Sequence, residues 1–302
     1  MGVASTLDQL WGSIPPLVTP FRSGEVDYET YGRLVEAQVA AGSHGVLVNG
    51  TTGEPSLLTV DERNRLVDVA MEAAAGRLPV VAATGSQSLL ESRQLTVHAA
   101  EAGVAAVLVV TPYYVRPPQR GIVAYYAQVV DGLETPWLVY HIPGRAAVGV
   151  TVDTLAQLHD ASPTFVGMKH AVNDLALVSA VLARLGPDFR VLVGLEELSF
   201  PMMAVGACGL MNAVGNLAPA RLVEICEAVR EGDLHRGRKL HESLYELNEA
   251  VFFDTNPIPV KYMMKRMGLL ADNEHRLPMV PATPEVAARL DAVLDRAGLL
   301  PA

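Results

Sequence analysis

The chain has 302 residues, half of them hydrophobic, and a formal net charge of −10. This length suits one α/β barrel with a C-terminal extension, or two smaller domains, and the apolar content supports a large core without disulfide bonds. The acidic balance and the lack of a long basic run argue against nucleic acid as a partner.

Eight short apolar runs rich in Val, Ile and Leu predict eight β-strands. They are near-continuous apolar strings rather than strict alternations, which is typical of parallel strands covered on both faces. In chain order the runs are Ile14–Phe21, Gly45–Gly50, Pro79–Thr84, Ala106–Tyr113, Trp137–Pro143, Phe165–Ala171, Arg190–Glu196 and Gly209–Gly215.

Amphipathic stretches between these runs predict helices, including Tyr28–Ala41, Asp61–Ala75, Leu89–Ala102 and Asn173–Leu185. Eight strand–helix units in one series indicate an α/β fold of the (β/α)8 TIM-barrel type. A doubly wound open sheet is the alternative. That fold would carry a glycine-rich nucleotide fingerprint after its first strand, where this sequence has Thr19-Pro20-Phe21.

Four more helices are predicted after the eighth strand: Ala218–Glu231, Leu234–Phe253, Pro257–Met267 and Pro284–Ala297. The first of them completes the barrel, and the others form a helical extension. We therefore expect the barrel to span residues 1–231 and the C-terminal helical extension to span residues 232–302.

Signals for targeting and for metal binding are weak in this sequence. Cys208 and Cys226 form no CxxC pair, and no Cys/His cluster has zinc spacing. The first basic residue is Arg22, so no signal peptide is indicated, and no apolar run reaches the about 18 residues of a membrane span. We expect a cytoplasmic protein with no metal and no membrane partner.

The catalytic groups of such a barrel lie at the carboxyl ends of its strands. Lys169 stands out there, because it alone of the four lysines lies in an apolar strand, whereas the other three lie in the C-terminal helical region, where solvated amines are common. Burial disfavours an ammonium ion, and a neutral amine attacks a ketone carbon to form an imine. A structural ion pair with Glu196 or Glu54 is the alternative.

Three other elements lie at the same strand ends. The turn Gly50-Thr-Thr-Gly-Glu54 presents backbone N–H groups and two hydroxyls to an anion, or is an ordinary glycine-containing loop. Tyr140 either transfers protons beside the lysine or serves only as a packing residue at the end of its strand. Arg145 either binds a carboxylate or is an ordinary solvated arginine in a loop. Their joint position on one rim favours the functional interpretation.

Together these residues resemble the dihydrodipicolinate synthase / N-acetylneuraminate lyase family of class I pyruvate aldolases. The resemblance runs from about Ile14 to Pro281, and its pieces stand in family order: Gly50-Thr-Thr-Gly-Glu54, Thr111-Pro-Tyr-Tyr114, Tyr140-His-Ile-Pro143, Gly167-Met-Lys169 and Asn256-Pro-Ile-Pro-Val-Lys261. The paired threonines, Arg145 and the Arg276-Leu-Pro-Met279 ending are most similar to the synthase branch.

The resemblance implies a role for each matching position. Lys169 would form the Schiff base with pyruvate, Tyr140 would be the general acid/base, and Thr51 would relay protons with Tyr114, which a second subunit would donate. The residues implied to bind substrate are Gly50, Thr52, Gly194 and Met211 for pyruvate, and Arg145 for the carboxylate of aspartate semialdehyde. The resemblance also implies a homotetramer, a dimer of dimers, and a reaction without a cofactor.

Several positions depart from the synthase pattern. His141 stands where Asn is usual, His170 stands where Glu is usual, and Leu195-Glu196 replaces an Asp-Asp pair. We expect His141, His170 and Glu196 on the side of the second substrate, which puts the aldehyde partner in doubt. The histidines either add a protonatable pair to the pocket or bond neighbouring loops. Thr59-Val-Asp-Glu-Arg63 lacks the histidines of lysine-inhibited synthases, which predicts weak or absent inhibition by lysine.

Three functions follow from these observations. The first is a 4-hydroxy-tetrahydrodipicolinate synthase, which condenses pyruvate with aspartate semialdehyde in lysine biosynthesis. The second is another pyruvate-dependent aldolase or hydro-lyase, acting on a 2-keto-3-deoxy sugar acid, N-acetylneuraminate or an aromatic aldehyde. The third is a catalytically silent barrel with a binding role, against which the intact set of Lys169, Tyr140 and Thr51 argues.

Overall fold

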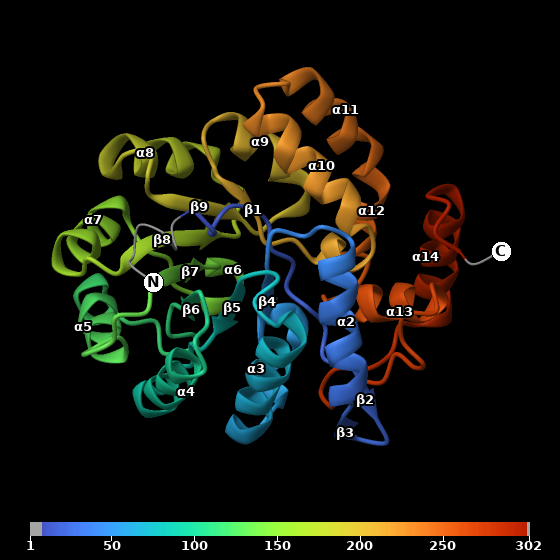
Figure 1. The fold of residues 1–302 in the computed structure, drawn as a ribbon, viewed down its shortest axis with the longest axis horizontal. Helices are drawn as coiled ribbons and strands as arrows, with labels where there is room; N and C mark the ends of the chain where they lie inside the picture. The colour runs from blue at the N-terminus through green and yellow to red at the C-terminus, as the bar shows by residue number, and fades with distance from the viewer. Residues whose placement is uncertain (1–7, 301–302) are drawn as a thin grey trace.

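The computed structural model describes residues 8–300, and these form eight parallel strands surrounded by helices (Figure 1). The sheet runs in the order β1-β10-β9-β8-β7-β6-β5-β4. Its strands are β1 (Gly12–Ser13), β4 (Val46–Val48), β5 (Val80–Ala83), β6 (Ala106–Val110), β7 (Trp137–His141), β8 (Phe165–His170), β9 (Arg190–Val193) and β10 (Gly209–Leu210). The predicted TIM-barrel class is confirmed.

The segment after β1 closes the barrel. Pro16 forms a parallel bridge with Leu47 of β4, where Leu17 N–H donates to the Leu47 carbonyl at 3.0 Å and Leu47 N–H donates to the Pro15 carbonyl at 2.9 Å. The first strand ends at Ser13, just before the predicted run Ile14–Phe21 begins, and that run joins the barrel sheet only through the bridge at Pro16, because Pro15, Pro16 and Pro20 have no N–H group for a ladder. The predicted eighth strand is also shorter, since a 3-10 turn begins at Ala213.

Phe21 lies outside the barrel sheet, which corrects the prediction for the end of the first run. It belongs to an antiparallel pair formed by β2 (Phe21–Arg22) and β3 (Glu25–Val26). The two-residue turn between them, Ser23-Gly24, has positive φ angles of 53° and 84°, which is typical of a tight hairpin.

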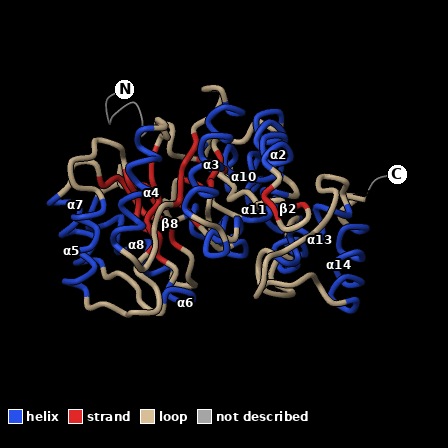
Figure 2. The backbone as a smooth tube through the Cα atoms, turned by 90° about the horizontal axis from the view of Figure 1, so that it is seen from below, coloured by secondary structure: helices blue, strands red, loops and turns tan. Residues whose placement is uncertain are grey.

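Helices cover the outside of the sheet (Figures 1 and 2). They are α2 (Tyr28–Ala40), α3 (Val60–Ala74), α4 (Leu89–Glu101), α5 (Gln119–Val129), α7 (Val152–Ala161), α8 (Leu175–Leu185), α9 (Ser199–Ala204) and α10 (Pro219–Arg230), whereas the short α6 (Pro143–Ala146) lies directly after the carboxyl end of β7. Side-chain oxygens cap several of them, and at α3 Thr59 and Glu62 form a reciprocal capping box.

The C-terminal region adds α11 (Leu234–Ser243), α12 (Tyr245–Ala250), α13 (Ile258–Arg266) and α14 (Pro284–Arg296). The predicted single helix over Leu234–Phe253 is two helices, which meet at Leu244. The expected boundary after residue 231 falls at the turn that contains Gly232, whose φ is 80°. Helices α13 and α14 lie to one side of the barrel, beyond α2 (Figures 1 and 2).

Apolar side chains fill both faces of the sheet, which explains the near-continuous apolar runs. On β6, Leu108 belongs to the cluster inside the barrel, whereas Val107 and Val109 pack in the layer under the helices. The same alternation on β7 turns Tyr140 to the inside and Val139 to the outside. Residues one apart at the strand ends therefore face different surroundings.

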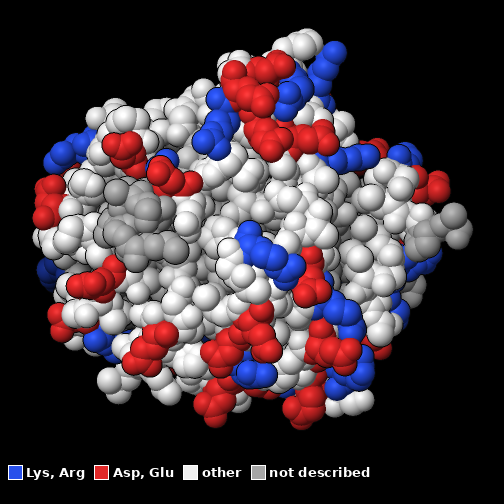
Figure 3. Space-filling view, in the orientation of Figure 1, with Lys and Arg blue, Asp and Glu red and all other residues white. Residues whose placement is uncertain are grey.

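Charged side chains lie mainly at the periphery of the molecule. On the face in Figure 3, acidic and basic side chains are interspersed around the edge, and much of the centre is uncharged. None of the described helices is long and apolar enough to span a bilayer.

Candidate active site

The ladder between β7 and β8 brings two predicted catalytic residues side by side. Tyr140 is aligned with Lys169, and His141 is aligned with His170. The Lys169 Nζ lies over the Tyr140 ring, 4.5 Å from its centre. Since Tyr140 faces the inside of the barrel, this alignment directs the lysine amine to the inside as well.

Lys169 is buried, with 3% of its surface exposed. Among residues 8–300, no carboxylate lies within ion-pair distance of its Nζ. The alternative of an ion pair with Glu54 is wrong, because the Glu54 carboxylate binds Lys261 Nζ at 2.9 Å and His275 Nδ1 at 3.1 Å. The amine of Lys169 is thus held in place without a contacting anion.

Lys261 corrects a second expectation. The lysines of the C-terminal region were expected to be solvated, but Lys261 on α13 is fully buried and bonds Glu54, at the end of the threonine turn. A buried charge requires such a partner. The ion pair therefore connects the C-terminal helices to the loop that carries Thr51 and Thr52.

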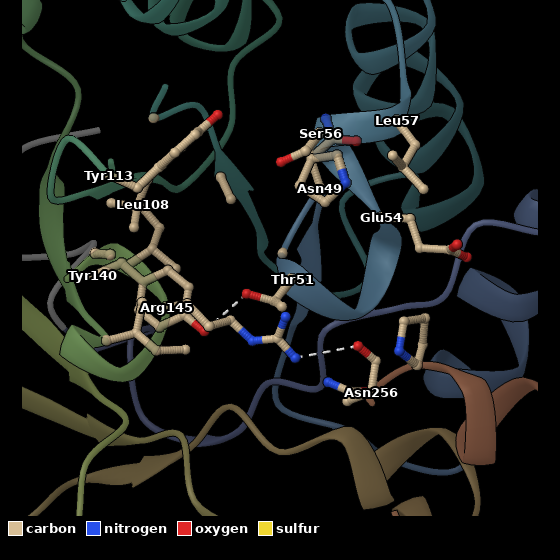
Figure 4. Close-up of a pocket in the computed structure, with 18 of the residues that line it drawn as sticks. Asn49, Thr51, Glu54, Ser56, Leu57, Leu108, Tyr113, Tyr140, Arg145 and Asn256 are labelled. Carbon is tan, nitrogen blue, oxygen red and sulfur yellow. Dashed lines mark hydrogen bonds between the residues drawn. The ribbon is translucent and has the colours of Figure 1, made fainter. Parts of the chain in front are cut away.

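The threonine turn lies directly after β4. It forms the 3-10 helix η1 (Thr51–Gly53), in which Gly53 N–H donates to the Gly50 carbonyl at 2.8 Å. A Cβ at Gly50 would come within 3.1 Å of Leu47 and Pro16, so a larger residue has little space there. The turn brings the Thr51 Oγ1 to 3.1 Å from the Tyr140 hydroxyl (Figure 4).

Thr52 and Arg145 meet at a residue to which the sequence assigned no role. Asn256 donates its side-chain N–H to Thr52 Oγ1 at 3.0 Å. Figure 4 shows its second contact, in which its backbone carbonyl accepts from Arg145 Nη2 at 3.3 Å. Asn256 opens the motif Asn256-Pro-Ile-Pro-Val-Lys261, so its place in that motif was the available signal. It joins the two predicted carboxylate-binding residues.

A cavity of about 270 Å³ opens between these elements. Of the predicted residues, Gly50, Thr51, Tyr140 and Arg145 line it, together with Tyr113 and Asn256. Lys169, Thr52, Gly194 and Met211 are not among its lining residues. Lys169 lies behind the Tyr140 ring, Met211 is buried in the same interior cluster, and a Cβ at Gly194 would come within 2.7 Å of Lys169 Cε.

Tyr114 is separate from this cavity. Its surface is 87% exposed, its φ is 70°, and the neighbouring Val115 is also exposed. Tyr113, one residue earlier, lines the cavity instead. Within one chain Tyr114 is therefore not part of the cavity, and its implied role depends on a second subunit.

His141 and His170 also lie away from the cavity, although the sequence suggested the second-substrate side. Both are buried, and their Nδ1 atoms are 3.2 Å apart. His170 Nε2 lies 3.1 Å from the Asp174 carbonyl, to which it can donate, which leaves its Nδ1 to accept from His141. Burial lowers the pKa of His141 to about 4 and also lowers the pKa of His170, so both are neutral at pH 7.

Glu196 is the third residue predicted on the second-substrate side. It is buried in the 3-10 helix η3 (Glu196–Leu198) and does not line the cavity. Residues 8–300 contain no group of three or more His, Cys, Asp or Glu side chains that could hold a metal ion.

Comparisons with known proteins identify the family of the chain. The model of the "Dihydrodipicolinate synthetase family" matches residues 9–297. A 4-hydroxy-tetrahydrodipicolinate synthase of Thermus thermophilus is 47% identical over 291 residues, which cover 96% of this chain and 97% of the relative. The synthase of Aquifex aeolicus is 40% identical over 288 residues, which cover 95% of this chain and 98% of the relative.

Solved structures extend the likeness to three dimensions. The crystal structure of dihydrodipicolinate synthase from Aquifex aeolicus has a TM-score of 0.94 at 39% identity, covering 96% of this chain and 99% of that one. The Acinetobacter baumannii enzyme in complex with pyruvate has a TM-score of 0.93 at 33% identity, covering 96% and 100%. This chain therefore belongs to the dihydrodipicolinate synthetase family.

Proposed function

We propose that this chain is a 4-hydroxy-tetrahydrodipicolinate synthase, which condenses pyruvate with aspartate semialdehyde. The observation that carries the proposal is the position of the buried Lys169 amine, which has no contacting anion and lies over the Tyr140 ring. The Tyr140 hydroxyl in turn lies 3.1 Å from Thr51 Oγ1. An amine, a phenol and a hydroxyl in this order supply a nucleophile and a path for protons. The names of the full-length relatives support the same activity.

The first steps use the Lys169 amine. Its nitrogen attacks the ketone carbon of pyruvate, and the ketone oxygen leaves as water to give an iminium ion. The iminium draws electrons from the methyl group, which loses a proton to become an enamine. Tyr140 and Thr51 exchange these protons through their contact at 3.1 Å.

The later steps build the ring. The enamine carbon adds to the aldehyde carbon, and the aldehyde oxygen takes up a proton to become a hydroxyl. The amine of the former aspartate semialdehyde then attacks the iminium carbon, which releases the Lys169 amine and closes the ring. None of these steps requires an external oxidant or reductant.

The carboxylates of the two substrates have separate partners in this proposal. Thr52 and the backbone N–H groups after Gly50 hold the pyruvate carboxylate, with Gly194 and Met211 packed against the lysine side. Arg145 lines the cavity and binds the carboxylate of the aldehyde.

The alternative of another aldolase or hydro-lyase rested mainly on His141 and His170. Because both side chains bond each other and Asp174 away from the cavity, they give no support to a different aldehyde. Arg145, which favours a carboxylated aldehyde, lines the cavity. The observations therefore favour the synthase.

The assembly and the location are part of the same proposal. We propose a cytoplasmic homotetramer in which each Tyr114 completes the proton relay of a neighbouring subunit. The high exposure of Tyr114 in the single chain supports such a contact. A similar solved structure, at 35% identity and a TM-score of 0.93, is of a monomeric dihydrodipicolinate synthase variant, and sedimentation of this protein would distinguish a monomer from the proposed tetramer.

Borohydride trapping tests the proposed function directly. Incubation with pyruvate and borohydride, followed by mass spectrometry, is expected to give one covalent adduct per chain on Lys169. The variant Lys169→Ala is expected to give none, and Lys239→Ala, which changes an exposed lysine, is the control. An unmodified wild-type chain would instead support the catalytically silent barrel.

A further inference from the structure

Glu196 is a buried carboxyl group that takes no part in the reaction steps proposed above. Only 2% of it is exposed, in the 3-10 helix directly after β9. Its Oε1 accepts a hydrogen bond of 2.6 Å from the Ala213 N–H, at the start of the turn after β10. The side chain thus spans the carboxyl ends of two neighbouring barrel strands, on the rim that carries Lys169.

Strand β9 brings Glu196 near Lys169. Lys169 is aligned with Leu192 in the ladder between β8 and β9, and a Cβ at Gly194 would come within 2.7 Å of Lys169 Cε. Glu196 follows Gly194 by two residues. No ion pair joins the two groups within contact distance among residues 8–300, so the carboxyl group acts on the lysine through space and forms no bond with its nitrogen.

The electrostatic surroundings of Glu196 contain one nearby cation. Burial raises the pKa of Glu196 to about 7, which the Ala213 N–H and the positive charge of Lys169 oppose. The exposed carboxylate of Glu197, in the same turn, raises the pKa of Glu196 further. The carboxyl group is therefore poised to change its charge when the charge on Lys169 changes.

The other elements around this turn add no second cation. Helix α9 and the turn Ala213–Asn216 contain no titratable side chain. Helix α12 packs against the turn, and its titratable groups are all exposed: Tyr245, Glu246 and Glu249. The pKa of His241 on α11 is influenced by the Glu197 backbone and by the Glu242 and Glu197 carboxylates, and not by the Glu196 carboxyl group.

We propose that Glu196 is the counter-ion of the iminium that forms on Lys169, an inference that rests on the function proposed above. The Lys169 amine, the pyruvate ketone and the Glu196 carboxylic acid become the iminium cation, the Glu196 carboxylate and one molecule of water. Three hydrogens are involved: two on the amine nitrogen and one on the carboxyl group. One of them stays on the iminium nitrogen, and the other two leave in the water molecule. The net charge of the buried pocket stays the same, which avoids the cost of an isolated buried charge.

The variant Glu196→Gln separates charge from shape. The amide oxygen can still accept from the Ala213 N–H, but the side chain cannot ionise. Because a nearby opposite charge shifts the pKa of a group by about 1–3 units, the iminium of the variant should lose its proton at a pH at least about one unit lower. Borohydride trapping across about pH 6 to 9 should show this shift, with about tenfold less adduct at pH 8.

The neighbouring variant Glu197→Gln is the matched control, since it removes an exposed carboxylate from the same turn. Its trapping curve is expected to shift far less than that of Glu196→Gln, because the Glu197 carboxylate is the weakest of the influences named above on the pKa of Glu196. Glu196→Asp keeps the charge, so its trapping curve is expected to keep the wild-type midpoint. Circular dichroism of Glu196→Gln would reveal a folding defect. A Glu196→Gln curve that overlays the wild type would overturn the counter-ion role alone, whereas a wild-type chain without an adduct would overturn the proposed function as well.

Discussion

Arg145 and Lys169 reach the site in different ways. Lys169 is buried in a strand and held by packing. Arg145 is an exposed side chain on α6, and its guanidinium donates a hydrogen bond to the Asn256 carbonyl at 3.3 Å. A weak bond of this kind leaves the guanidinium free to exchange the carbonyl for a substrate carboxylate. The nucleophile is therefore rigid and the carboxylate-binding group is adaptable.

Substitution of Arg145 tests this assignment. Arg145→Ala should raise the Michaelis constant for aspartate semialdehyde about ten- to hundredfold, because hydrogen bonds to charged groups contribute about 1.5–3 kcal/mol. Trapping of pyruvate on Lys169 should be spared. Steady-state kinetics with both substrates measure the effect, and Arg184→Ala, an exposed arginine of α8, is the control. Unchanged aldehyde kinetics would show that Arg145 has another role.

At the scale of elements, the catalytic turn depends on a helix slightly more than 200 residues later in the chain. Glu54, the last residue of the turn, adopts a left-handed conformation with φ of 56° and bonds Lys261 of α13 and His275. All three side chains are buried. The C-terminal helices therefore hold the loop that carries Thr51, and the extension contributes to the geometry of the site.

Loss of the Lys261 charge should destabilise the fold strongly. Lys261→Met leaves the Glu54 carboxylate buried beside only His275, and breaking a buried pair costs about 3–5 kcal/mol. Thermal and denaturant unfolding measure the change. Lys265→Met, on the same helix, removes an exposed partner of Asp272 and should cost at most about 1 kcal/mol.

The double variant Glu54→Gln/Lys261→Met checks the reason for this loss. Because it removes the unpaired charge, it should recover part of the stability that Lys261→Met loses. If the double variant is less stable than Lys261→Met, packing rather than charge explains the effect.

The histidine pair between β7 and β8 should make the fold sensitive to acid. Burial lowers the pKa of His141 to about 4, below its ordinary value of 6.5. The unfolded chain therefore binds a proton at a higher pH than the folded chain, so stability falls as the pH drops from about 6.5 to 4, by up to about 3 kcal/mol. His141→Asn, which can still donate to His170, should flatten this decline in melting temperature. His235→Asn, at an exposed position of α11, should leave it unchanged.

At the scale of the whole molecule, one implied catalytic residue does not line the cavity of its own chain. Tyr114 is exposed, although the tyrosine before it lines the cavity. Its backbone φ of 70° is unusual for a residue other than glycine, and such a conformation is more common where a residue has a particular role. A neighbouring subunit that buries Tyr114 would account for both features.

Mixing two inactive variants tests this contribution. If Tyr114 acts in a neighbouring subunit, refolding Lys169→Ala together with Tyr114→Phe should restore activity, because mixed dimers contain one site with every group intact. A mixture of Lys169→Ala with Tyr140→Phe should stay inactive, since both residues belong to the same subunit. No recovery in the first mixture would contradict the proposed exchange of Tyr114, and sedimentation would then show whether the protein associates.

The sequence by itself determined the fold class, the family and the residues at the strand ends. Apolar runs at regular spacing predict parallel strands, and a lysine in such a run is chemically unusual, so both are local properties of the chain. The alignment of Tyr140 with Lys169 and the contact between Thr51 and Tyr140 agree with the predicted common rim.

Only the tertiary structure decided which neighbouring residues share the site. His141 and His170 differ from Tyr140 and Lys169 by one position, and a strand turns successive side chains to opposite faces, so they bond each other instead. The pairing of Glu54 with Lys261 and the bond from Asn256 to Thr52 join segments about 200 residues apart. No local pattern contains such contacts, because closure of the barrel and packing of the C-terminal helices create them.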